Sequence, residues 1–124
     1  MKVVFIAGPL TTGGDCTKEN IERNVKIALE YTIALAKERV GFFCAHTHTT
    51  HENGHGGITA PEQFYYDMDF EILKKVADAV LAIPDWEKSV GAKKEVEWAK
   101  QNNKKIFYPK NQSDLKEVIE WAKA

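Results

Sequence analysis

The chain has 124 residues, 44% of them hydrophobic and 28% charged, which is the composition of one globular domain spanning 1–124. Its 17 basic and 18 acidic side chains give a net charge of -1, which argues against electrostatic binding of nucleic acid or of a membrane surface. We therefore expect a small-molecule partner.

The first apolar run, residues 3–7, ends at Gly8-Pro9 and is too short for the hydrophobic region of a secretory signal. We interpret it as a buried strand. Cys16 and Cys44 form neither a CxxC motif nor a repeated pair spacing, so we expect free thiols rather than a redox or zinc motif. Both observations favour a cytoplasmic protein.

Four short apolar runs predict strands buried on both faces of a parallel sheet. They are residues 3–7, 41–45, 79–83 and 105–108. Helical spacing lies between them. The first helix is expected after a Thr17 cap, with Gly41 as its stop, and its inward face comprises Ile21, Val25, Ala28, Leu29, Thr32, Leu35 and Ala36.

The second helix is expected to start at Pro61 and to bury Phe64, Met68, Ile72 and Val76, which recur every four residues. The third follows Gly91 and buries Ala92, Val96 and Ala99. The last opens near Ser113, where Asp114 and Glu117 suit the positive end of the helix dipole, and it buries Leu115, Val118, Ile119 and Ala122.

Strands that alternate with helices in this way predict an α/β protein: an open parallel sheet with helices on both faces. Ligands of such sheets bind outside the carboxyl ends of the strands, where the strand order switches. Function is therefore expected in residues 8–16, 46–60 and 84–91.

The loop after the first strand, residues 8–14, is rich in glycine and matches neither the dinucleotide-binding nor the P-loop pattern. Its glycines allow a close approach of the backbone to a phosphate or a sugar. The alternative is a tight strand-to-helix turn that binds nothing.

The loop at 84–91 carries the stronger chemical pattern. Ser89 and the amides around Gly91 form an anion or hydroxyl site at a helix N-terminus. Glu95 follows within two turns, where the helix dipole favours its charged form, so it is a candidate carboxylate nucleophile. The alternative for Glu95 is a solvated residue that only complements the dipole.

A second carboxylate is needed for glycosidic-bond chemistry, which uses acidic side chains in pairs. Asp69, on the preceding predicted helix, is the candidate partner of Glu95, and Asp67 is its rival. Spacing alone does not choose between them. Trp86 either stacks on a ligand ring or serves as a packing lid.

Taken together, three segments resemble the nucleoside 2-deoxyribosyltransferase superfamily over nearly the whole chain. They are Phe5-Ile6-Ala7-Gly8-Pro9-Leu10, then Asp69 leading to Ala77-Asp78-Ala79-Val80, then Pro84-Asp85-Trp86 with Ser89-x-Gly91-Ala92-x-x-Glu95. The resemblance is closest to a branch of short single-domain members. Relatives include the nucleoside 5'-monophosphate N-glycosidases, and the resemblance implies a flavodoxin-like three-layer α/β/α fold, no cofactor and a homodimer.

The resemblance also implies catalytic roles. Glu95 matches the nucleophile that attacks C1' of the sugar and holds it as a covalent ester after the nucleobase leaves. Asp69 matches the acidic residue that assists departure or return of the base. An oxocarbenium-like transition state favours such a carboxylate on the sugar face.

Substrate-binding roles follow from the same resemblance. Ser89 and Gly91 match positions that hold the sugar or its 5'-phosphate, and Gly8, Pro9 and Leu10 begin the loop that closes over the ligand. His46 matches a polar position of the nucleoside pocket, and Trp86 is the candidate for stacking on the base. The first loop offers no basic residue for a phosphate.

All four histidines of the chain lie in residues 46–55. His46 and His48, completed by His51 or Glu52, have the side chains of a three-ligand zinc site. The resembled family uses no metal, so we interpret this loop as a polar pocket wall or a mobile lid. The expected function is cleavage or transfer at the N-glycosidic bond of a nucleoside or nucleotide, and the alternatives are a non-catalytic nucleotide-binding module and a metal-dependent hydrolase.

Overall fold

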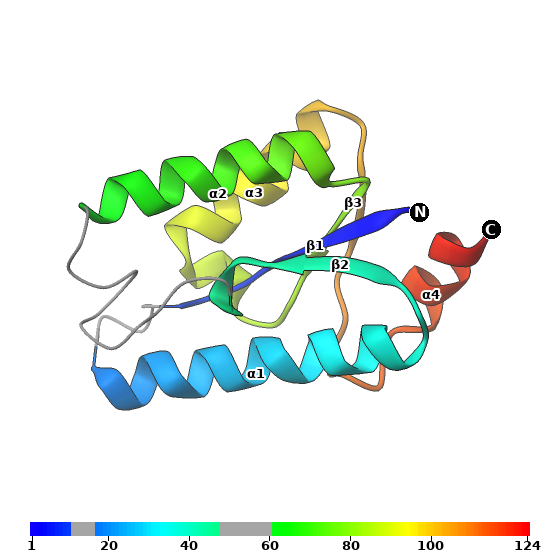
Figure 1. The fold of residues 1–124 in the computed structure, drawn as a ribbon, viewed down its shortest axis with the longest axis horizontal. Coiled ribbons are helices and arrows are strands. Elements are labelled where there is room, and N and C mark those ends of the chain that lie inside the picture. The colour runs from blue at the N-terminus through cyan, green and yellow to red at the C-terminus, as the bar shows by residue number, and fades with distance from the viewer. Residues whose placement is uncertain (11–16, 48–60) are drawn as a thin grey trace.

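The computed structural model describes residues 1–10, 17–47 and 61–124 (Figure 1). Four strands form one all-parallel sheet in the order β2-β1-β3-β4. The strands are β1 (Val3–Ala7), β2 (Gly41–Cys44), β3 (Ala79–Ala82) and β4 (Lys105–Phe107). The predicted open α/β architecture is confirmed, with three of the four strands one residue shorter than expected.

Four helices cover the sheet: α1 (Lys18–Lys37), α2 (Glu62–Val76), α3 (Val90–Gln101) and α4 (Lys116–Lys123). Short 3₁₀ turns follow β2 at Ala45–Thr47 and β3 at Trp86–Lys88. In Figure 1, α2 and α3 lie over one face and α1 and α4 over the other. The protein is therefore a three-layer α/β/α domain of the flavodoxin-like type.

The period-two alternation of the central strands divides the core into two halves. Val4 and Ile6 of β1 pack with α1 and α4, whereas Phe5 and Ala7 pack with α2 and α3. Every residue of β3 is buried. Burial on both faces explains why these strands appear in the sequence as unbroken apolar runs.

The end of α1 corrects one expectation. The helix stops at Lys37, and Arg39, not a glycine, takes the left-handed conformation with a φ of 59°. The Arg39 and Val40 amides donate to the carbonyls of Ala36 and Leu35, which closes the helix. Gly41 is instead the first residue of β2.

The inward face of α1 also differs in part from its prediction. Thr17 caps the helix as expected, because its Oγ1 accepts a hydrogen bond from the Asn20 amide. Leu29 is 43% exposed, and Ala36 is exposed as well. Tyr31, which was not expected on the inward face, is buried instead, because its ring packs into the core between α1 and the sheet.

The α2 helix is rotated relative to its prediction. Phe64 is 53% exposed and Val76 is 37% exposed, while Tyr65, Asp69 and Leu73 are buried. The inward face is therefore shifted by one residue. The last helix, α4, begins at Lys116 rather than near Ser113, because the Asp114 carboxylate accepts a hydrogen bond from the Lys110 amide in the preceding turn.

None of the helices in the described ranges is long and apolar enough to cross a bilayer.

Candidate functional site

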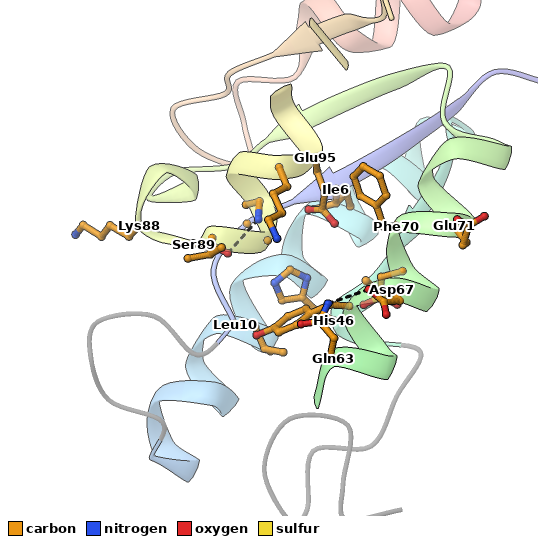
Figure 2. A pocket seen from close by; sticks show the side chains of 18 residues that line it. Ile6, Leu10, His46, Gln63, Asp67, Phe70, Glu71, Lys88, Ser89 and Glu95 are labelled. Carbon is orange, nitrogen blue, oxygen red and sulfur yellow. Dashed lines mark hydrogen bonds between the residues drawn. The ribbon is translucent and has the colours of Figure 1, made fainter. Parts of the chain in front are cut away.

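A pocket of about 720 Å3 opens at the carboxyl ends of the strands (Figure 2). The chain passes from β1 to β2 on one side and then to β3 on the other, so the strand order switches at this place. Seven of the nine predicted site residues line the pocket: Gly8, Leu10, His46, Asp69, Ser89, Gly91 and Glu95. Loops that are far apart in sequence are brought together here as the sequence pattern predicts.

Glu95 points into the pocket from the second turn of α3 (Figure 2). Burial of the carboxyl group, with a smaller contribution from the negative charge of Asp69, raises the pKa of Glu95 well above its usual value. A solvated, dipole-complementing carboxylate would not show this shift. A carboxyl group in a pocket whose pKa is shifted by burial and by a charged neighbour is a candidate for a functional residue.

Asp69 reaches the same pocket from α2 and is only 9% exposed. Position 69 is buried because the inward face of α2 is shifted by one residue, and its charge acts on Glu95 in the same pocket. Asp67, its rival, also lines the pocket, but it is exposed and accepts a hydrogen bond from Gln63 at 2.8 Å. Asp69 is therefore the carboxylate electrostatically coupled to Glu95.

Gly8 lets the first loop leave β1 against the side chain of Ile83. A Cβ at position 8 would lie 2.4 Å from Cγ1 of Ile83, which is itself buried. At this position glycine is required by close packing.

Gly8→Ala should lower the free energy of unfolding by roughly 1–3 kcal/mol, because buried Ile83 has little room to move away. Urea unfolding of the variant and the wild type measures the change. Gly91→Ala is the matched control, since its new Cβ would meet no atom closer than 3.9 Å. Equal losses in the two variants would contradict the packing argument.

His46 joins the loops that follow β1 and β2. A carbonyl oxygen only accepts hydrogen bonds, so the His46 Nε2–H donates to Pro9 O at 2.9 Å. Nδ1 of the same ring lies 3.8 Å from the Cys44 sulfur. Burial raises the pKa of Cys44, which keeps the sulfur in the thiol form and makes it a poor nucleophile.

Ser89 caps α3, as its Oγ accepts a hydrogen bond from the Ala92 amide at 3.1 Å. The remaining amides of the first turn, including that of Gly91, are at the pocket wall. Lys94, which sequence reasoning missed, also lines the pocket. Its position next to Glu95 in sequence was the available signal.

Two aromatic rings of α2, Tyr66 and Phe70, line the pocket and were also missed. The signal that could have found them is their spacing of one helical turn. The expected inward face of α2 placed both on the wrong side of the helix. Cε1 of Tyr66 lies 3.9 Å from the place where a Cβ on Gly91 would be, so the walls from α2 and α3 approach each other there.

Two predicted residues take other places. Trp86 is not among the lining residues and packs against Tyr108, with ring centroids 5.8 Å apart. It also packs against the core beneath α2 and α3, which agrees with its packing alternative. Pro9 contributes its carbonyl to His46 rather than a side chain to the pocket lining.

The metal-binding alternative falls largely outside the described residues. His48, His51, Glu52 and His55 lie in 48–60, and Cys16 lies in 11–16. Within residues 1–10, 17–47 and 61–124, no group of three or more His, Cys, Asp or Glu side chains is placed to hold a metal ion.

The comparisons with known proteins add a family without a known activity. A search of curated proteins gives no significant match to this sequence. The match to a family model covers residues 2–108, which include every lining residue of the pocket. The chain therefore belongs to the family described as Domain of unknown function (DUF4406).

Proposed function

We propose that this protein breaks or exchanges the N-glycosidic bond of a nucleoside or nucleoside 5'-monophosphate. The observation that carries the proposal is the pair of carboxyl groups formed by Glu95 and Asp69 in one pocket. Paired carboxylates flanking an anomeric carbon are the common machinery of glycosidic-bond cleavage. The resemblance of the sequence to nucleoside 2-deoxyribosyltransferases supports the same chemistry.

In the proposed reaction, the Glu95 carboxylate attacks C1' of the sugar, and a bond forms between its oxygen and that carbon. The C1'–N bond breaks, and its electron pair leaves with the nucleobase, which takes up the proton of Asp69. Water or a second base then attacks C1', gives a proton to Asp69 and releases the Glu95 carboxylate. The acceptor decides whether the overall reaction is hydrolysis or transfer.

The charges of the pair suit this sequence of steps. The negative Asp69 and burial hold a proton on Glu95 at a pH where an exposed glutamate is ionised. Two interacting carboxyl groups therefore share one proton over a range of pH. In the reactive form of the pair the shared proton lies on Asp69, so that Glu95 is the carboxylate that attacks and Asp69 holds the proton for the departing base.

The wall of the pocket formed by the first turn of α3 supports binding of the sugar and its 5' end. Amides of the first turn of α3 and the Lys94 ammonium provide a positive environment beside Ser89. Lys88, another cation of the lining, lies 3.4 Å from Asp85 and is partly neutralised by it. A 5'-phosphate would thus find the cation that the first loop lacks. The proposal retains the homodimer that the resemblance implies and the cytoplasmic location expected from the first apolar run and the cysteines.

The test is to incubate the wild-type protein with ribo- and deoxyribonucleosides and their 5'-monophosphates, with and without an added acceptor base. Free base and new nucleosides are followed by chromatography, with Glu95→Ala as the inactive control. Base release by the wild type alone is the expected result, and dependence on the acceptor separates transfer from hydrolysis. Tight nucleotide binding without turnover of any substrate would replace the proposal with a non-catalytic binding module.

A further inference from the structure

We infer that Gln63 and Asp67 of α2 recognise the nucleobase and select bases that carry an exocyclic amino group. The inference rests on the proposed function, because it assumes that the pocket holds a nucleoside or nucleotide. It adds a binding role for Gln63, which the sequence motifs do not single out, and for Asp67, which they offered only as a rival catalytic carboxylate. The base classes selected are those of guanine, adenine and cytosine.

The orientation of the Gln63 amide is fixed by its neighbour. Nε2 of Gln63 donates to Oδ1 of Asp67 at 2.8 Å, one helical turn away. A carboxylate accepts hydrogen bonds and donates none, so the amide nitrogen, and not the oxygen, must face Asp67. The Gln63 carbonyl oxygen and the second Asp67 oxygen are then left to accept hydrogen bonds from a ligand.

This pair presents more acceptors than donors at the pocket wall. One Nε2 hydrogen of Gln63 stays available as a donor, against lone pairs on Gln63 Oε1 and Asp67 Oδ2. An amino group on a base supplies two donor hydrogens. A keto oxygen at the same position would bring two acceptors together, so keto bases are expected to bind more weakly.

The remaining walls place the base beside this pair. Tyr66 and Phe70 lie on the same helix as Gln63 and Asp67 and line the same pocket, giving aromatic surface against which a planar ring packs. Gly91 leaves open the space in front of Tyr66, as a Cβ there would lie 3.9 Å from Cε1 of the ring.

The two ends of the pocket therefore suit different parts of a nucleoside: the end at Glu95 and Ser89 suits the sugar, and the end at Gln63 and Asp67 suits the base. Figure 2 shows the Gln63–Asp67 pair at the end of the view away from Glu95 and Ser89. A sugar held at Glu95, with its 5' end towards Ser89 and the first turn of α3, directs the base away from α3. The acceptor-rich pair on α2 is thus placed to meet the outer edge of the base.

Binding is measured by calorimetry in the Glu95→Gln background, so that the result does not depend on turnover. The ligands are matched pairs of 5'-monophosphates: guanosine against inosine, which differ by one amino group, and cytidine against uridine. We expect each amino-bearing ligand to bind roughly tenfold more tightly than its partner. Adding Asp67→Asn should reduce both ratios towards one, because an amide replaces the carboxylate that accepts from the amino group, and for uridine the new amide can also donate to the keto oxygen.

Glu97→Gln is the matched control, since Glu97 accepts from Gln101 one turn away on α3 at 3.4 Å, outside the pocket lining. This control should leave the ratios unchanged. Equal affinity within both ligand pairs, or ratios that Asp67→Asn leaves unaltered, would overturn the inference. Amino-group selectivity in a wild-type protein that never releases base would overturn the proposed chemistry and leave the recognition role standing.

Discussion

Glu95→Gln should abolish base release and at the same time stabilise the folded protein at pH values above the raised pKa of Glu95. The rate should fall roughly 10³-fold or more, because the amide cannot form the covalent ester. The free energy of unfolding should rise by about 1 kcal/mol, because a carboxylate with no hydrogen-bond partner among the described residues is removed from a half-buried place at the pocket wall.

The sign of the stability change depends on pH. Since the pKa of Glu95 is higher in the folded protein than in the unfolded chain, the folded state binds more protons between the two values. Wild-type stability therefore falls as the pH rises through that window. The advantage of Glu95→Gln should be complete above the raised pKa and absent in acid, where both side chains are neutral.

Thermal unfolding of both proteins across a pH series measures this difference. Glu97→Gln, an exposed position on the same helix, should show no such pH-dependent gain. A Glu95→Gln protein that is less stable than the wild type above the raised pKa of Glu95 would mean that the glutamate has a structural role in the site.

Asp69→Asn should change the pH dependence of the reaction as well as its rate. Without the negative charge of Asp69, the pKa of Glu95 should move down towards its usual value. Glu95 then ionises at lower pH, so the acid limb of the kcat/KM profile should shift to lower pH. The maximal rate should fall roughly 10²–10⁴-fold, since the departing base loses its proton donor.

Base release is followed over a pH series for the wild type, for Asp69→Asn and for Glu97→Gln as the control. The fall in rate alone would also follow from a general structural disturbance. The shift of the acid limb would not, because it reports the charge next to Glu95. An acid limb that stays in place would show that Asp69 is not coupled to the nucleophile.

The architecture was predictable because the central strands are buried on both faces. Successive side chains such as Val4 and Phe5 pack against helices on opposite faces of the sheet, so the strands are apolar at every position and differ from the spaced pattern of the helices. The helix ends were less predictable. Arg39 adopts a positive φ, which glycine adopts far more readily than other residues. The hydrogen bonds that close α1 outweigh the conformational energy that this backbone angle costs.

The catalytic candidates on α3 were predictable because Ser89, Gly91 and Glu95 lie on one short segment. The α2 side of the pocket was not. Apolar residues occupy two neighbouring faces of this helix, so the pattern beginning at Phe64 competed with the pattern through Leu73. Only the tertiary packing against β1 and α3 selects the second, and this places Asp69 beside Glu95.

The hydrogen bond between His46 and Pro9 has a consequence for how the pocket accommodates its ligands. It links the segment that follows β1 to the segment that follows β2, and these two strands are neighbours in the sheet. The ring of Pro9 also fixes the φ angle of the first segment at this residue. We therefore expect a ligand that displaces Leu10 to shift the segment after β2 as well as the segment after β1. We expect the two segments to move together, so that a substitution in one of them also changes the ligand shapes that the other accepts.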